Sequence, residues 1–92
     1  MINMTHIKGT DKGPVKLYAI STCVWCKKTK QLLDKLHVAY DFIYTDLLEG
    51  EEKKEVMKEI EKWNPRCSFP TIVINQQCIV GFKENEIREK LN

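Results

Sequence analysis

The chain has 92 residues, of which 42% are hydrophobic, so it can bury one core but is too short for two domains. Its net charge of +2 comes from 15 basic and 13 acidic residues that are interspersed, which argues against a dedicated nucleic-acid binder. Because residues 1–13 lack the apolar core of a signal peptide and no apolar run could cross a bilayer, we expect a soluble, cytoplasmic monomer without a membrane or nucleic-acid partner.

The first half of the chain predicts an arm, a strand, a helix and a second strand. Residues 1–14 are polar and end at Pro14, so we interpret them as a flexible arm. The short apolar run at residues 15–20 is typical of a strand, and residues 24–36 follow with a helical pattern. Aromatic and β-branched side chains at residues 39–45 then indicate a second strand.

The second half predicts a helix, a hairpin and a closing helix. Residues 51–63 place three apolar side chains at i, i+4 and i+7, and therefore on one helix face: Val56, Ile60 and Trp63. Residues 71–74 and 78–80 are short apolar runs separated by three residues, which is hairpin spacing. Residues 84–91 close the chain as a short helix.

These elements predict an α/β fold in the order β-α-β-α-β-β-α. A strand, helix and strand in succession imply a parallel pair joined by a right-handed crossover. The closing hairpin must be antiparallel, so we expect a four-stranded mixed sheet flanked by three helices. This is the thioredoxin-like arrangement, and we assign it to residues 15–92.

The most informative motif is Cys23-Val24-Trp25-Cys26, which lies between the first strand and the first helix. Unpaired amide groups and the helix dipole favour an anion there, so the attacking thiol should have a pKa below its free value of about 8.5. Residues i and i+3 share a helix face, so the two sulfurs can form one bond. In a reducing compartment such a pair is catalytic or metal-binding more often than structural.

Together with this motif, two later stretches give the chain a resemblance to the glutaredoxins over residues 15–91. These stretches are residues 68–71, which read Ser-Phe-Pro-Thr, and residues 79–82. The resemblance implies that Cys23 is the nucleophile and that Cys26 resolves the mixed disulfide. It also implies a cis Phe69–Pro70 bond, next to which the backbone can pair with an extended thiol substrate.

Several residues near the two sulfurs are candidates for substrate contact. Trp25 stands where relatives carry Tyr and would desolvate a docked partner. Lys27 lies four residues after Cys23 and would add to the helix dipole, although a solvated helix edge is the plainer interpretation. Gly81 indicates a close backbone approach, and Phe82 reads equally as core or as substrate contact. The full set is Trp25, Lys27, Phe69, Pro70, Thr71, Gly81 and Phe82.

The sequence departs from the glutathione-using pattern of this family. Ile20 stands where a lysine often binds a glutathione carboxylate, Phe69 replaces the usual Val, and Val80 replaces the first of two glycines. The stretch at residues 81–87, GFKENEI, is more similar to the glutaredoxin-like redoxins that supply ribonucleotide reductase. We therefore expect no tightly bound cofactor, with a small thiol such as glutathione or, in preference, a thioredoxin-reductase-type reductant as the electron source.

The predicted function is dithiol–disulfide exchange that reduces protein or mixed disulfides. One alternative is a glutathione-independent electron donor to ribonucleotide reductase. The alternative from another class is a metal or iron–sulfur module, but ten residues separate Cys67 from Cys78, so no second closely spaced pair exists and we predict no metal ligands. Cys67 is interpreted as a free loop cysteine, with a third redox thiol as the lesser interpretation.

Overall fold

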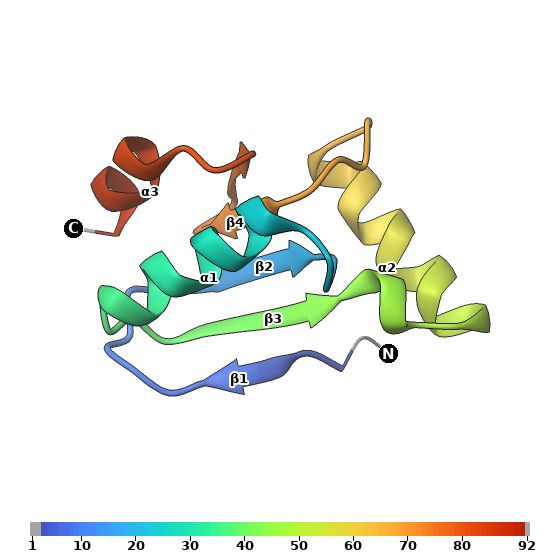
Figure 1. Cartoon of the computed structure of the whole chain (residues 1–92), viewed down its shortest axis with the longest axis horizontal. Coiled ribbons are helices and arrows are strands. Elements are labelled where there is room, and N and C mark those ends of the chain that lie inside the picture. Colours follow the sequence, from blue (N-terminus) through green and yellow to red (C-terminus); the bar gives the residue numbers. More distant parts are fainter. Residues whose placement is uncertain (1–2, 92) are drawn as a thin grey trace.

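Strand β2 (Val15–Ala19) lies in the middle of the sheet, and four of its five side chains are buried. Figure 1 shows the computed structural model, which describes residues 3–91. The strands are ordered β1-β3-β2-β4-β5 across the sheet. The other elements are β1 (Thr5–Ile7), α1 (Val24–Lys35), β3 (Tyr40–Tyr44), the short 3₁₀ helix η1 (Thr45–Leu47), α2 (Gly50–Trp63), β4 (Thr71–Ile74), β5 (Gln77–Val80) and α3 (Glu84–Lys90).

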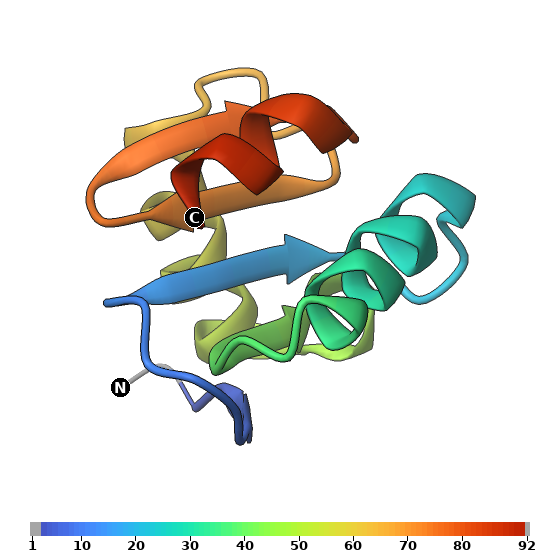
Figure 2. The same ribbon diagram turned by 90° about the vertical axis from the view of Figure 1, so that its left-hand side faces the viewer.

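The side chains of β2 alternate between two hydrophobic clusters, one on each face of the sheet. Leu17 packs in a cluster with buried residues of α1 and α3, whereas Tyr18 packs with Val56 and Ile60 of α2. This two-residue period is what a strand buried on both faces requires. Helices α1 and α3 therefore cover one face and α2 covers the other, as Figures 1 and 2 show.

The pairing of the strands confirms the predicted mixed sheet. Strands β2 and β3 are parallel, whereas β2 pairs with β4, and β4 with β5, in antiparallel fashion. The hairpin between β4 and β5 turns at Asn75 and Gln76, whose φ angles are 48° and 69°. Two consecutive positive φ values are the geometry of a type I′ turn, which Asn tolerates well. The turn therefore takes two residues rather than the predicted three, and Gln77 belongs to β5.

A fifth strand corrects the predicted four-stranded sheet and the predicted arm. Strand β1 pairs antiparallel with the outer edge of β3, with Thr5 opposite Phe42 and Ile7 opposite Tyr40. Without β1 the edge of β3 would leave its backbone hydrogen-bonding groups unpaired. The strand is only three residues long and mostly exposed, so no hydrophobic periodicity indicated it. Within residues 1–14, Met1 and Ile2 lie outside the described part of the chain.

The other predicted elements are confirmed, and their ends lie within one residue of the observed ones. Accuracy of this kind follows from the periodic burial of α1 and α2 and from the breakers that separate the elements. Among the described residues, none of the helices combines the length and the apolar character that a membrane crossing requires.

Candidate active site

Cys23 is the N-cap of α1 and holds its sulfur against the first turn of the helix. Its backbone is extended, with φ −87° and ψ 120°, and its Sγ accepts a hydrogen bond from the backbone N–H of Cys26 at 3.1 Å. This N–H is one of the amides at the start of a helix that lack a partner within the helix. A donor aimed at the sulfur, together with the positive end of the helix dipole, stabilises negative charge on Cys23.

Cys26 is the more protected of the two thiols. It is 2% exposed and packs in the cluster under α1, whereas Cys23 is half-buried at the surface. Burial, followed by the hydrogen bond to Cys23, raises the pKa of Cys26 to about 12. The reduced pair is therefore asymmetric, with one accessible sulfur and one sulfur that stays a neutral thiol.

The turn before Cys23 is held by Asp46, a residue that the sequence analysis missed. The backbone N–H of Ser21 donates to Asp46 Oδ1 at 2.8 Å, and the Ser21 hydroxyl donates to Oδ2 at 2.5 Å. These two hydrogen bonds lower the pKa of Asp46. They tie the turn at residues 21–22 to η1, at the end of the neighbouring strand β3, and so fix the chain just before the N-cap.

The loop after α2 is held by a buried asparagine. The side-chain amide of Asn64 donates to Ser68 O at 3.2 Å, to Ser68 Oγ at 3.0 Å and to Thr71 Oγ1 at 3.1 Å. The Thr71 hydroxyl in turn donates to Ser68 O at 2.7 Å. The Phe69–Pro70 bond lies in the same loop, directly after Ser68, and is cis as predicted. The Thr71 side chain is fully buried in this network and does not line the adjoining pocket.

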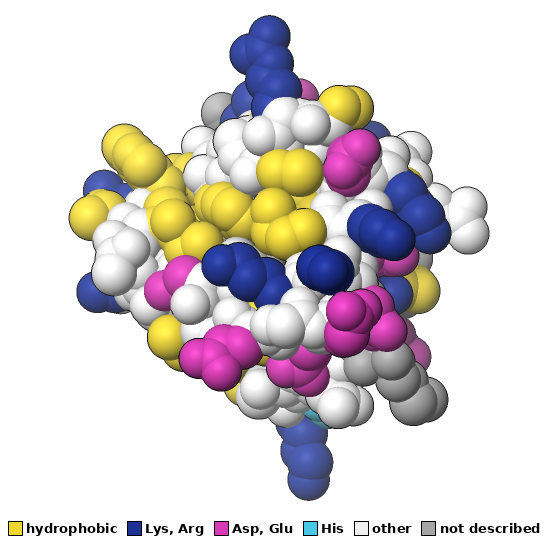
Figure 3. Space-filling model, turned by 90° about the vertical axis from the view of Figure 1, so that its right-hand side faces the viewer, with side chains coloured by type: hydrophobic (Ala, Val, Ile, Leu, Met, Phe, Trp, Pro, Cys, Tyr) yellow, Lys and Arg dark blue, Asp and Glu magenta, His cyan; other side chains and the backbone are white. Residues whose placement is uncertain are grey.

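A small pocket brings five of the predicted substrate-contact residues together. It measures about 210 Å³, and its lining consists of Trp25, Phe69, Pro70, Gly81 and Phe82. The Trp25 ring is 55% exposed and stacks on Phe82 with centroids 5.9 Å apart. Figure 3 views the end of the molecule where β2 and β3 terminate, and it shows a continuous hydrophobic area bordered by charged side chains. Such a surface can desolvate the segment on each side of a substrate disulfide.

A cation that the sequence analysis did not name, Lys28, lies beside this pocket. Lys28 Nζ lies 4.8 Å from the centre of the Trp25 ring, in a cation–π contact. Lys27 is exposed on the first turn of α1. The helical spacing i, i+3 from Trp25 to Lys28 could have indicated the contact, since residues three apart are neighbours on a helix.

Cys67 packs on the face of the sheet that α2 covers, whereas Cys26 packs on the other face. Cys67 is half-buried and packs against the cluster that contains Val56 and Ile60 of α2, and its backbone N–H donates to Asn64 O at 2.8 Å. Cys23 packs instead against the cluster under α1. The structure therefore assigns Cys67 to a different hydrophobic cluster from the reactive pair.

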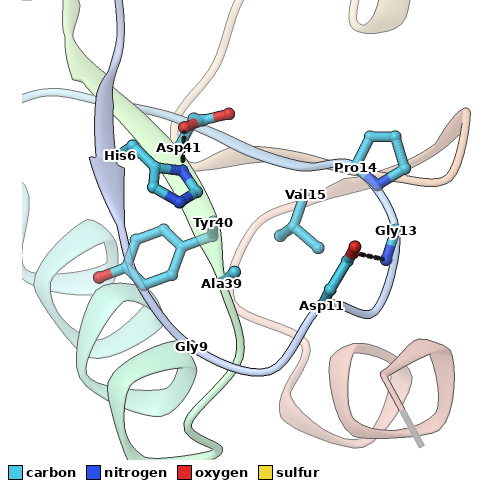
Figure 4. Close-up of a pocket in the computed structure, with 9 residues that line it drawn as sticks. All are labelled: His6, Gly9, Asp11, Gly13, Pro14, Val15, Ala39, Tyr40 and Asp41. Carbon is cyan, nitrogen blue, oxygen red and sulfur yellow. Dashed lines mark hydrogen bonds and ion pairs between the residues drawn. The ribbon is translucent and has the colours of Figure 1, made fainter.

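A larger pocket lies at the other end of the sheet, and its lining includes ionisable side chains. It measures about 520 Å³ and includes His6, Asp11 and Asp41 in its lining (Figure 4). His6 Nδ1 contacts Asp41 Oδ1 at 2.8 Å across strands β1 and β3. The lining also includes Val15 at the start of β2, whereas Cys23 follows the end of that strand. We place the candidate active site at the smaller pocket, because Trp25, which lies between the two cysteines in the chain, lines it.

Strand β2 pairs in parallel with β3 and leads into a helix capped by the first of two closely spaced thiols, and a cis proline lines the pocket that contains Trp25. This arrangement is that of a thioredoxin-like redox protein. The glutaredoxin family profile matches residues 15–79. A glutaredoxin-like 8.6 kDa protein of the Clostridium pasteurianum rubredoxin operon is 34% identical over 73 residues, which cover 79% of this chain and 91% of that protein. The chain therefore belongs to the glutaredoxin family.

Two solved structures agree with this assignment over nearly the whole chain. The glutaredoxin from Methanosarcina mazei Go1 is 49% identical with a TM-score of 0.89, and the match covers 100% of this chain and 97% of that one. Methanoredoxin from Methanosarcina acetivorans is 50% identical with a TM-score of 0.88, over 91% of this chain and 90% of that one. The chain is accordingly a glutaredoxin-like redox protein, and thiol–disulfide exchange is the general chemistry of its family.

Proposed function

We propose that this protein reduces protein disulfides by a two-cysteine route and takes its electrons from a dithiol donor rather than from glutathione. The observation that carries the proposal is the asymmetric pair at the start of α1. Cys23 is accessible and its sulfur accepts the Cys26 N–H, while Cys26 is buried directly behind it. The neighbouring pocket supplies an apolar surface on which a substrate segment can lie.

In the first step the Cys23 thiolate attacks one sulfur of the substrate disulfide. The new bond joins Cys23 Sγ to that sulfur, and the old S–S bond breaks. The other substrate sulfur leaves as a thiolate and takes a proton from water. The Phe69 backbone next to the cis proline is the edge along which the substrate segment would pair.

In the second step Cys26 releases the substrate. Its thiol gives up a proton to water and its sulfur attacks Cys23 Sγ, so that the mixed disulfide breaks and the substrate leaves as a thiolate. The hydrogen bond and the charge from Cys23, which both raise the pKa of Cys26, disappear once Cys23 is bonded to substrate. Cys26 is therefore easier to deprotonate when its attack is needed. Overall, two electrons pass from the two cysteines to the substrate, whose two thiolates take their protons from water, and a dithiol donor must return the two electrons.

Side chains at the glutathione-contact positions support independence from glutathione. Ile20 offers no charge at the place where relatives bind a carboxylate with lysine. Val80 is 36% exposed and carries a branched side chain where relatives have a glycine. A donor to ribonucleotide reductase is the narrower form of this proposal, and it rests on the similarity of the stretch at residues 81–87.

A panel of reductants tests this proposal. Oxidised protein is mixed with glutathione, with dithiothreitol as a small dithiol, or with thioredoxin reductase and NADPH, and the return of thiols is followed in time. We expect a dithiol donor to be much faster than glutathione at equal thiol concentration. The Val80→Gly variant, which restores the glycine, should gain rate with glutathione alone. Rapid reduction of the unaltered protein by glutathione would refute this part of the proposal.

The metal or cluster function stays a prediction of its own. Among residues 3–91, no group of three or more His, Cys, Asp or Glu side chains is placed to hold a metal ion. A cluster bridged between two subunits would draw only Cys23 from each and the other ligands from external thiols. Visible absorbance and iron content after anaerobic purification, with Cys23→Ser as the control, measure this function directly.

A further inference from the structure

A second groove continues from the Trp25–Phe82 pocket along the surface between α1 and α3. It measures about 290 Å³, and Phe82 lines both the groove and the pocket. Its walls carry Lys28 and Lys35 from α1 and Arg88 from α3. The groove therefore begins at Phe82, which stacks on Trp25, and leads away between α1 and α3.

The charges in this groove are mostly positive and mostly uncompensated. Lys28 and Lys35 have no ion-pair partner among the described residues, and Lys28 Nζ lies over the Trp25 ring. Arg88 Nε is paired with the carboxylate of Glu84 at 2.9 Å, so the one acidic side chain of the groove is already engaged. Two unpaired ammonium groups beside an apolar pocket attract carboxylates that approach together with an apolar side chain.

We propose that this groove binds an acidic segment of the disulfide-bearing protein substrate. The inference rests on the proposed function and extends it by naming the chemistry of the partner. An apolar side chain next to the substrate cysteine would enter the Trp25–Phe82 pocket, and Asp or Glu side chains farther along would meet Lys28 and Lys35. The segment would be extended, because its backbone pairs beside the cis proline before it reaches the groove.

The geometry of α1 sets the spacing of the acidic residues. Lys35 follows Lys28 by seven residues, which is about 10 Å along a helix axis. An extended peptide covers that distance in about three residues. Lys28 itself lies five residues after Cys23, or about 8 Å. The segment that fits best therefore has one carboxylate about two residues from its cysteine and another about three residues farther on.

Two matched peptide disulfides test the groove. One has Glu at the two positions above, the other has Gln at both, and kcat/KM is measured for each with unaltered protein, Lys35→Gln and Lys58→Gln. Lys58 lies on α2 and lines no part of the groove, so it is the matched control. We expect the acidic peptide to be preferred, and Lys35→Gln to reduce that preference about two- to fivefold. Higher salt should reduce the preference as well.

Equal kcat/KM for both peptides with the unaltered protein would overturn the proposal, as would an equal loss for both peptides in Lys35→Gln or the same loss in Lys58→Gln. If neither peptide is reduced at all, the proposed function fails instead. Binding of the same peptides with blocked cysteines to the Cys23→Ser variant, followed by tryptophan fluorescence, then tests the groove by itself. Tighter binding of the acidic peptide that Lys35→Gln weakens supports the groove, and equal binding of the two peptides overturns it.

Discussion

The two ends of strand β2 border two pockets that differ in size and in chemistry. The pocket near Val15 is the larger, at about 520 Å³, and is lined by His6 and Asp41, whose ion pair is largely exposed. The pocket at the other end, near Cys23, is less than half that size and is lined by aromatic rings, a proline and a glycine. The two thiols of the proposed function flank Trp25, which lines the smaller pocket, so the larger cavity is not the one beside the two cysteines.

The difference between the two ends comes from how each holds its polar groups. At the end with the cysteines, one thiol is buried and the other is accessible. The buried contacts of Asn64 hold the loop that would position a partner. At the opposite end, the polar contact between β1 and β3 joins two exposed side chains and closes the edge of the sheet. The comparison predicts that substitutions at the first end change reactivity, whereas those at the second change stability slightly.

The largest expected effect is the loss of exchange in Cys23→Ser. Because a serine hydroxyl is not ionised and cannot form the mixed disulfide, insulin reduction with dithiothreitol as donor should fall to the rate of dithiothreitol alone. His6→Ala is the control at the other end. It should keep the full rate and change the free energy of unfolding by less than about 1 kcal/mol. A slow His6→Ala variant with normal stability would contradict the division between the two ends.

The next effect concerns stability at alkaline pH. The pKa of Cys26 is raised from an ordinary value of 9.0 to about 12 in the folded protein, so the unfolded chain loses this proton first. The contribution of Cys26 to stability is therefore fully present below pH 9 and is lost as the pH rises toward 12, by up to about 1.4 kcal/mol per pH unit. Tyr18, whose pKa burial raises to about 12, contributes only above pH 10.

Urea unfolding of the reduced protein at pH 8, 9 and 10 measures this dependence. In Cys26→Ala the free energy of unfolding should fall less steeply between pH 9 and 10, with a slope smaller by up to one bound proton. The packing that the variant loses lowers its stability equally at every pH and does not change this slope. Identical pH dependence in both proteins would show that the Cys26 thiol is not protected as its burial implies.

Asn64→Ala should affect both stability and activity. The substitution removes the amide that donates to the buried Thr71 hydroxyl and to exposed Ser68, at a cost of about 1–3 kcal/mol, and frees the loop that carries Phe69. Tyr40→Phe is the matched change toward the other end, because it removes one hydrogen bond to Asp34. That variant should lose about 1 kcal/mol and keep its rate. Chemical denaturation and insulin reduction on both variants decide between a local and a general effect.

Trp25→Ala should change stability only modestly, since this ring is more than half exposed. The loss of its stack on Phe82 should cost about 0.5–1.5 kcal/mol. Reduction of protein disulfides should slow about tenfold, because the ring is the exposed wall of the pocket. Trp63→Phe, on α2, serves as the control for loss of a tryptophan. An unchanged rate in Trp25→Ala would contradict the proposal that the substrate binds at this pocket.

The sequence predicted the parts of this molecule that depend on local periodicity. Val56 and Ile60 fall on one face of α2 as their spacing required, and the cysteine spacing predicted the start of α1. Strand β1 could not be predicted because its stability comes from the edge of β3, more than 30 residues away. The contact of Ser21 with Asp46 was missed because these residues lie 25 positions apart in the chain and meet only in the fold.

The candidate site shows the same limit at the scale of single side chains. Thr71 was predicted by resemblance as a substrate contact, yet its hydroxyl turns inward to Ser68 and Asn64. The contact of Lys28 with the Trp25 ring was not among the predicted contacts. The direction of each side chain depends on partners that only the folded chain brings together.

The most direct test of the two-cysteine route is capture of its intermediate. Cys26→Ser is mixed with a peptide disulfide, and the products are digested without reduction and mapped by mass spectrometry. The route predicts one peptide attached to Cys23 that persists for lack of the resolving thiol, and rapid release of that peptide in the unaltered protein. Attachment at Cys67 or Cys78, or full turnover by Cys26→Ser, would contradict it.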